Sequence, residues 1–330
     1  MKNEIKKRKV LFITLDYMSY TAIICSGISK YLDAETHLIT TTGKELNFTY
    51  RNSVHRIQNF LSKLFLNKNQ KKIFYNKMIK KKLVTVFEDH PQFDDIFILR
   101  PDLINEHLCF IKDHGKRLIA YFWDSFSRIP QGRRTIGFFD KFFSFEPKDV
   151  KDHQLLFLSN FCPPDLEINN NETPHFDLSY VASYDKRVNT LEKILFSLKP
   201  LNLKTNINIL ATKTTTSKNE KSITWFTDIL PRKETIRIMN DCSVLLDIAQ
   251  PKQEGLSFRI FEAMKLGKKI ITTNRSVTTY DFYDAKNIFV WENETTIPVK
   301  DFFTAPFAPL PAEILNKYSL QNWVSTIFDE

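Results

Sequence analysis

Cysteine and glycine are both scarce in this sequence, which has 4 cysteines and 7 glycines in 330 residues. The cysteines stand far apart and include no Cys-x-x-Cys pair. This spacing argues against a zinc site and a disulfide framework, and it fits a reducing compartment. The histidines are scattered too, so we expect no metal site. A Gly-x-Gly-x-x-Gly motif and a phosphate-loop lysine are missing, so a dehydrogenase or nucleotidase finds no support.

Long apolar runs are missing as well, and no stretch approaches the length of a membrane span. The first residues are basic and then apolar, like the beginning of a signal peptide. The apolar run Val10–Leu15 stops at Asp16, however, and is too short for an export signal. We therefore expect a cytoplasmic protein.

Acidic residues are absent between Leu46 and Phe87, where ten residues are basic. The net charge of the whole chain is +9, so this window is a local basic patch. Lys71–Phe87 has the spacing of a helix with one apolar side, and a basic amphipathic helix lies in the headgroup plane of a membrane. We predict that Lys71–Lys82 docks on an anionic membrane surface, peripherally on the inner face of the cell membrane. The alternative is a solvated helix whose apolar side packs on its own domain.

The length and composition suit two globular domains, with 42% hydrophobic and 26% charged residues. Apolar strands alternate with helices in both halves, which indicates parallel sheets covered on both faces. The best linker is Cys162–Phe176, with three prolines and three consecutive asparagines. We predict an N-terminal domain over residues 1–165, a second domain over residues 166–310 and a helical segment over residues 311–330.

The predicted strands share short apolar runs: Lys9–Leu15, Thr36–Thr41, Asp95–Arg100, Arg117–Trp123, Lys141–Glu146, Leu155–Phe161, Asp177–Ser183, Asn206–Thr212, Ile223–Thr227, Val244–Ala249, Lys269–Thr273 and Ile288–Glu292. The predicted helices lie between them: Thr21–Leu32, Val54–Leu66, Lys71–Phe87, Leu103–His114, Val188–Leu198, Lys233–Asn240, Phe258–Leu266 and the tail Pro311–Glu330.

The stretch Gln253–Asn274 reads QEGLSFRIFEAMKLGKKIITTN and places two of the seven glycines around two glutamates. It follows a predicted strand, and open parallel sheets bind ligands outside the carboxyl ends of their strands. Ser257 is placed to cap the next helix and Gly267 to end it. The helix start offers free N–H groups to a phosphate, and Gly255 lets a ligand approach the backbone closely.

Glu254 and Glu262 are the candidate ligand-binding carboxylates of this stretch. Two carboxylates that face one cleft can hold hydroxyl groups at two places on an elongated ligand, and a sugar nucleotide has that shape. The alternative is that these residues are ordinary surface charges that bind no ligand. Arg259 and Glu262, at three-residue spacing, can form a solvated helix pair, and Glu254 can be a simple loop charge.

The Glu-x7-Glu pattern within EG…FEAMKLGKKIITTN resembles the donor-site motif of retaining glycosyltransferases with the GT-B architecture. Its continuation, Thr278–Glu292, resembles a branch of bacterial enzymes that build capsule and lipopolysaccharide glycans. The match covers roughly Asp247–Glu292, and the two-sandwich layout extends it loosely over the chain. The resemblance implies an α/β fold with two Rossmann-like α/β/α domains facing a central cleft. It also implies a C-terminal helix that crosses back to the first domain.

The resemblance further implies that residues 1–165 form an acceptor-binding domain and residues 166–310 a nucleotide-sugar-binding domain. It also implies roles for the two glutamates. Glu262 matches the residue that holds the nucleotide ribose, so Glu262→Ala is expected to abolish transfer with little loss of stability. Glu254 matches the residue that contacts the donor sugar or its phosphates, although some relatives lack an acid at this position. Gly255, Leu256 and Ser257 match the loop whose amides face the donor.

Basic side chains on the diphosphate are also implied. Arg187, just after a predicted strand, is the first positional candidate, and Lys213 is the second. Arg259 either belongs to the site or orients Glu262. Fixed amides and such cations can stabilise the departing nucleoside diphosphate, so no metal and no cofactor are needed. The sequence contains no Asp-x-Asp, which speaks against the metal-dependent glycosyltransferase class.

The N-terminal domain is expected to hold the acceptor, a glycan or a lipid-linked glycan. Asp16 and Asp124 both fall at the carboxyl ends of predicted strands, where each can contact an acceptor hydroxyl or cap the next helix. Two other functions stay open: a GT-B-shaped isomerase of a sugar nucleotide, and a non-enzymatic polyanion-binding protein. The basic patch lacks an aromatic–basic recognition motif, so we expect no nucleic-acid partner.

Overall fold

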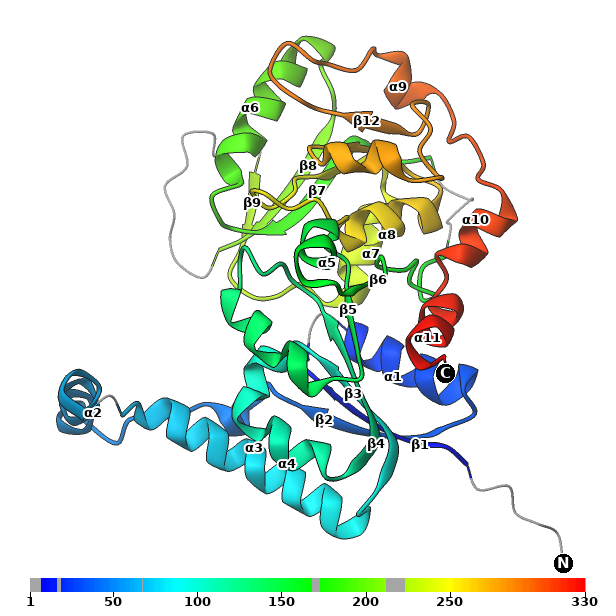
Figure 1. Cartoon of the computed structure of the whole chain (residues 1–330). Helices are drawn as coiled ribbons and strands as arrows, with labels where there is room; N and C mark the ends of the chain where they lie inside the picture. The colour runs from blue at the N-terminus through cyan, green and yellow to red at the C-terminus, as the bar shows by residue number, and fades with distance from the viewer. Residues whose placement is uncertain (1–6, 17–18, 67, 168–172, 212–222, 330) are drawn as a thin grey trace, which may run out of the picture. The chain divides into compact units, whose positions relative to one another are not determined.

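The structure is a computed structural model that describes residues 7–16, 19–66, 68–167, 173–211 and 223–329. The chain divides into two compact units, one formed by residues 1–144 and 149–157 and the other by residues 145–148 and 158–330. Each unit contains one six-stranded sheet of parallel strands with helices packed against it (Figure 1). The expected pair of α/β units is thus confirmed, while the assignment of acceptor and donor to them stays a prediction.

The first sheet has the strand order β2-β1-β3-β4-β5-β6. Its central strands are mostly buried, and β1 carries four consecutive apolar residues that are fully buried, Val10–Ile13. Such continuous apolar runs are typical of parallel strands covered on both faces. The strands are β1 (Lys9–Thr14), β2 (Glu35–Thr40), β3 (Phe93–Leu99), β4 (Gly115–Phe122), β5 (Lys141–Ser144) and β6 (Leu156–Phe157).

The helices of the N-terminal half are α1 (Tyr20–Tyr31), α2 (Ser53–Leu66), α3 (Gln70–Asp89), α4 (Leu108–Lys112) and α5 (Pro147–His153). The predicted helix Leu103–His114 is instead a 3-10 segment, Pro101–His107, followed by the short α4. The predicted strand Leu155–Phe161 shrinks to β6, and α5 was not predicted. The two-residue β6 lies at the edge of its sheet, where one neighbour is missing.

Helix α3 contains the segment predicted to dock on a membrane, and the structure shows where the apolar side of this helix packs. Its apolar residues Ile79, Leu83 and Phe87 are buried in the core of their own sheet. Lys72 and Lys82 form ion pairs with Glu106 at 2.5 Å and Glu45 at 2.7 Å. The apolar side of Lys71–Lys82 is therefore used inside the domain, as in the alternative stated above.

The second sheet has the order β12-β11-β10-β7-β8-β9. Side chains of β10 alternate between two cores: Leu245 packs with α7 and α8, whereas Val244 and Leu246 pack with α6 and α9. The strands are β7 (Phe176–Ser183), β8 (Thr205–Leu210), β9 (Ile223–Phe226), β10 (Cys242–Asp247), β11 (Lys269–Thr272) and β12 (Ile288–Val290). The helices are α6 (Val188–Leu198), α7 (Arg232–Asn240), α8 (Phe258–Leu266), α9 (Asp301–Thr304), α10 (Ala312–Lys317) and α11 (Leu320–Phe328).

The C-terminal tail forms two helices, α10 and α11, which belong to the second unit. Trp323 of α11 packs on Phe161 with ring centroids 5.0 Å apart, and Cys162 N–H donates to the carbonyl of Tyr318 at 2.7 Å. Helix α9 was not predicted, because its four residues are too few to show a period. No helix of the described residues combines the length and the apolar character needed to cross a membrane.

Candidate functional site

The stretch with the two glutamates forms a loop after β10, then α8, then β11. Gly267 ends α8 in the left-handed conformation, at φ 61°, as predicted. Ser257 occupies the position before the helix, but the prediction that its side chain caps α8 is wrong. The Ser257 hydroxyl instead donates to Asp247 Oδ1 at 2.7 Å, and Asp247 Oδ2 accepts from Thr272 Oγ1 at 2.8 Å. The buried Asp247 carboxylate thereby joins the ends of β10 and β11 to the beginning of α8.

Glu262 is buried on α8 and lies between two arginines. Its Oε1 accepts from Arg232 Nη1 at 2.6 Å, and its Oε2 accepts from Arg259 Nε at 3.3 Å. Arg259 also donates to the carbonyl of Val181 at 2.9 Å, and Arg232 pairs with Asp165. The solvated helix pair considered above is therefore wrong for Glu262, whose side chain is 6% exposed. An ion pair of this kind holds α8 to the N-terminus of α7 and to β7.

Gly255 is buried, and the group that approaches it closely is the chain itself. A Cβ atom placed there would lie 2.5 Å from both Phe145 Cδ2 and the Phe145 carbonyl oxygen. The backbone N–H groups of Glu254 and Gly255 both donate to the Glu146 carboxylate, at 3.1 and 3.2 Å. The explanation that Gly255 makes room for a ligand is thus corrected, because Phe145 fills that room.

Asn274, the last residue of the stretch, holds the same loop from the other side. Its side-chain amide donates to the carbonyls of Glu254 and Gly255 at 3.2 and 3.1 Å. Asn160 donates to the carbonyl of Leu256 at 2.9 Å. The loop is therefore fixed by buried polar side chains, while the Glu254 side chain is exposed. None of the described residues hydrogen-bonds the Glu254 carboxylate.

A cavity of about 620 Å³ lies at the carboxyl ends of β7, β10, β11 and β12. Its charged lining is mostly positive: Lys186, Arg187, Lys252 and Arg275 contribute, and Glu292 is the one acid among the described lining residues. Gln253 lines the cavity and Glu254 follows it, but neither Glu254 nor Glu262 is among the lining residues of the described chain. The cavity has the sign of charge that favours a phosphate group.

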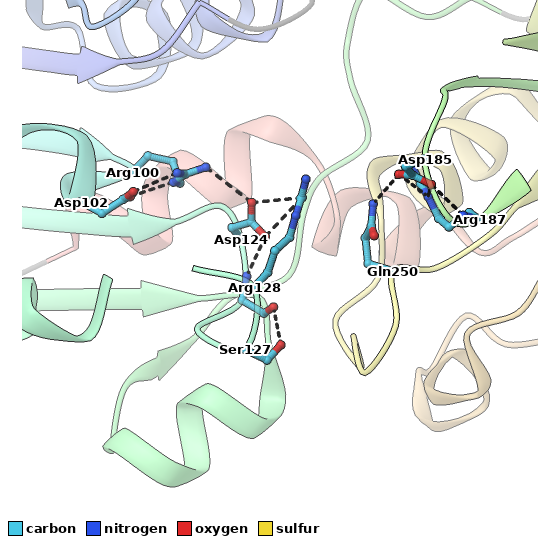
Figure 2. Close-up of polar contacts among 9 residues, drawn as sticks. Arg100, Asp102, Asp124, Ser127, Arg128, Asp185, Arg187 and Gln250 are labelled. Atoms are coloured by element: carbon cyan, nitrogen blue, oxygen red, sulfur yellow. Dashed lines mark hydrogen bonds and ion pairs between the residues drawn. The ribbon is translucent and has the colours of Figure 1, made fainter. Parts of the chain in front are cut away.

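Arg187 is fixed at the wall of this cavity by Asp185 and by the backbone (Figure 2). Its Nε donates to the Asp185 carboxylate at 3.0 Å and its Nη1 to the carbonyl of Ile248 at 3.0 Å. Gln250 donates to the same carboxylate at 3.2 Å. Burial lowers the pKa of Arg187, but the contact with Asp185, together with the nearby Tyr180 and Asp247, more than offsets this and leaves the pKa above its ordinary value. The second basic candidate, Lys213, lies outside the described residues.

Asp124, an acceptor candidate, lies at the carboxyl end of β4 in the first unit, among arginines (Figure 2). Its Oδ2 is 3.2 Å from Arg128 Nη1 and 3.5 Å from Arg100 Nη1, and its Oδ1 accepts from the Ser125 N–H at 3.0 Å. Asp102 binds Arg100 as well, at 2.8 Å. The side chain of Asp124 is 13% exposed, so this carboxylate is a part of a partly buried polar cluster.

Asp16, the other acceptor candidate, is exposed after β1, and its N–H donates to Thr42 Oγ1 at 2.7 Å. The residue that precedes α1 is Ser19, so Asp16 does not cap this helix. The structure also corrects the expectation that histidines do not group. His37 and His90 lie with Glu35, their ligand atoms all within 4.8 Å. Lys9 Nζ is 3.4 Å from His90 Nδ1 and 3.8 Å from Glu35, so an ammonium group already balances this cluster.

Sequence reasoning missed Glu146, Asp185 and Asn274. Asp185 and Asn274 come two residues after the ends of β7 and β11, which is the position that could have marked them. Glu146 is more than a hundred residues away from the amides that it binds, and no local pattern connects them.

No protein-family model and no curated protein matches this sequence. Among solved structures, the chain is similar to sucrose-phosphate synthase from Thermosynechococcus elongatus, with a TM-score of 0.55 and 8% identity, over 98% of this chain and 95% of the other. It is also similar to HepE from Anabaena in complex with UDP and glucose, with a TM-score of 0.53 and 11% identity, over 98% and 96% of the two chains. At such identities the likeness shows the fold, and the expected GT-B fold class is confirmed.

Proposed function

We propose that this protein is a glycosyltransferase that moves a sugar from a nucleotide-sugar donor to an acceptor. The observation that carries the proposal is the element after β10. There, a loop with an exposed glutamate and a helix with a buried glutamate stand at the carboxyl edge of a parallel sheet, beside a positively charged cavity. The neighbouring fold supports it, since the HepE structure contains UDP and glucose.

On the donor side, we assign the cavity to the phosphates. Arg187 stays charged and needs no reorganisation, so it can stabilise the charge of the departing nucleoside diphosphate. Glu254 is assigned to the donor sugar, and its exposed carboxylate supports this. Glu262 is assigned to the ribose, because each carboxylate oxygen can accept more than one hydrogen bond. Arg259 then orients Glu262, and Leu256 and Ser257 shape the loop.

The expectation that the loop's amides face the donor needs revision for Glu254 and Gly255, whose N–H groups donate to Glu146. In this proposal Glu146 holds the loop in the shape that presents the Glu254 side chain. A donor that reaches these two amides would first have to displace a buried carboxylate. Binding of the donor to the cationic side chains of the cavity displaces no carboxylate from the two amides.

On the acceptor side, we propose a glycan or lipid-linked glycan of a bacterial surface polysaccharide, with Asp16 and Asp124 as contacts for its hydroxyl groups. Retention of the anomeric configuration and independence from metal ions belong to the same proposal, which the Glu-x7-Glu resemblance supports. A proton NMR coupling constant of the product, compared with that of the donor, tests retention. An inverted product would mean that the resemblance misleads about the mechanism.

A thermal-shift screen against UDP, GDP, CMP and ADP tests the donor assignment. A ligand at about 100 times its Kd adds about 2.7 kcal/mol of stability to the native state. For a unit of this size that corresponds to an increase in Tm of roughly 5–10 °C. No shift with any nucleotide would contradict the proposal. A nucleotide sugar that is converted without any acceptor would favour the isomerase, and a shift with polyanions alone would favour the binding protein.

A further inference from the structure

Helix α2 exposes its apolar side to solvent. Six apolar residues repeat at helical spacing along it, and each is between 44% and 74% exposed: Val54, Ile57, Phe60, Leu61, Leu64 and Phe65. On a helix of 3.6 residues per turn these positions cover one continuous face. Soluble helices normally bury such a face in the core. We call these six residues the α2 apolar face.

The opposite, polar side of α2 is the side that attaches to the domain. Asn59 is buried, with its side-chain amide donating to the Tyr50 hydroxyl at 2.8 Å and its oxygen accepting from the Gln70 N–H at 2.8 Å. His55 packs edge-on against Phe48 and Tyr50. Because the polar side is fixed inward by these contacts, the apolar face is held outward. Figure 1 shows α2 beyond the N-terminal end of α3, away from the first sheet.

The charges around α2 indicate what covers this face. The window from Leu46 to Phe87 has ten basic residues and no acid. Arg56 and Lys63 are exposed on α2 itself, on the arc next to the apolar face. Their long side chains can keep the charged group in water while their apolar stems lie along the α2 apolar face. The partner must therefore be both anionic and apolar at its surface, and an anionic lipid bilayer has this chemistry.

We propose that α2 inserts its apolar face into the headgroup region of an anionic bilayer, with Arg56 and Lys63 paired to lipid phosphates. This moves the membrane contact from α3, whose apolar side is buried, to α2. The proposal rests on the proposed function in one respect only: membrane binding would bring the protein to a lipid-linked acceptor. Lipid binding itself needs no donor and no catalysis.

Cosedimentation of the full chain with vesicles tests the proposal. Vesicles of phosphatidylglycerol and phosphatidylcholine should bind the protein, more weakly at high salt, and pure phosphatidylcholine should bind it less. The double variant F60S/L64S should lower the partition coefficient by at least about tenfold, because it removes two of the inserted side chains. The matched control is Phe196→Ser on α6, an apolar residue that is 73% exposed in the second unit, and it should bind as the parent does.

A fluorescence measurement identifies the inserted residue. Phe65→Trp should show a blue-shifted emission on adding anionic vesicles, whereas Phe196→Trp should show none. Equal binding of the parent and F60S/L64S would overturn the proposal. So would a parent dimer that F60S/L64S converts to a monomer with unchanged vesicle binding, since the face would then contact a second copy. Nucleotide thermal shifts of F60S/L64S should match those of the parent, so that failure of lipid binding is distinguishable from failure of the proposed function.

Discussion

Replacement of Glu262 by alanine should destabilise the second unit strongly. The change leaves Arg232 and Arg259 without the carboxylate that lies 2.6 and 3.3 Å from them, and the Arg232 side chain is only 8% exposed. Removing one partner of a buried ion pair costs about 3–5 kcal/mol, because the remaining charge stays desolvated. Arg232 still pairs with Asp165 at 3.0 Å, so we expect the lower end of this range. This replaces the expectation from the sequence that Glu262→Ala leaves stability nearly unchanged.

Differential scanning calorimetry measures this effect. For a unit of this size, 1 kcal/mol corresponds to a change in Tm of about 2–4 °C, so the variant should melt at least about 6 °C below the parent. The matched control is Glu254→Ala, the other glutamate of the motif, whose exposed side chain predicts a change within about 0.5 kcal/mol. The reasoning is refuted if the two variants melt together, within 1 °C of the parent, on the order of the error of the measurement.

Three further changes test other parts of the account. Gly255→Ala should lower the free energy of unfolding by about 1–3 kcal/mol, because the added Cβ would meet the Phe145 carbonyl. Gly137→Ala, whose Cβ would have nothing within 4 Å, should leave stability unchanged. Equal denaturation midpoints of the two variants would exclude the close approach at Gly255. Arg187→Met should weaken nucleoside-diphosphate binding by about tenfold or more in calorimetric titration. Lys193→Met, which removes an exposed ion pair of the same unit, should not change this affinity. Unchanged affinity of the Arg187→Met variant would remove Arg187 from the donor site. Thiol labelling at pH 8 should modify the exposed Cys109 in the native protein but neither Cys162 nor Cys242, which are buried. Burial raises the pKa of these two thiols to about 12 and about 11, so both stay protonated at pH 8. Rapid labelling of either buried thiol would contradict its placement in the core.

The strands could be predicted from the sequence because parallel strands buried on both faces leave continuous apolar runs. Val10–Ile13 and the alternating Val244, Leu245 and Leu246 are examples, and neither needs long-range information. The loop and helix from Glu254 to Gly267 were visible for a similar reason, because their signals are local. Helix α8 begins and ends where the sequence indicates.

The direction of a helix face could not be predicted, since it depends on which side tertiary contacts fix. Both α2 and α3 have an apolar side in the sequence, yet α3 buries Ile79 and Leu83 while α2 exposes Phe60 and Phe65. For α2, two hydrogen bonds of Asn59 fix the inward side: its amide donates to the Tyr50 hydroxyl, and its oxygen accepts from the Gln70 N–H. Contacts between residues far apart in the sequence could not be predicted either, because they too depend on the tertiary structure.

Those distant pairs matter most at the candidate site. Glu146 meets the amides of Glu254 and Gly255 across a separation of more than a hundred residues, and Arg232 meets Glu262 from another helix. Neither partner has a local sequence signal. The sequence therefore marked Glu254 and Glu262 as candidates, but it could not show what these residues contact within the protein.

The most direct test of the central claim follows the donor itself. The full chain is incubated with UDP-, GDP- and ADP-linked sugars, with and without a bacterial lipid extract, and the phosphorus NMR spectrum is recorded over time. The account predicts that one donor is consumed, that its nucleoside diphosphate appears only with the extract, and that Glu254→Ala slows this release. If no donor is consumed in the presence of the extract, or if one is converted equally well without any acceptor, sugar transfer is not the function of this protein.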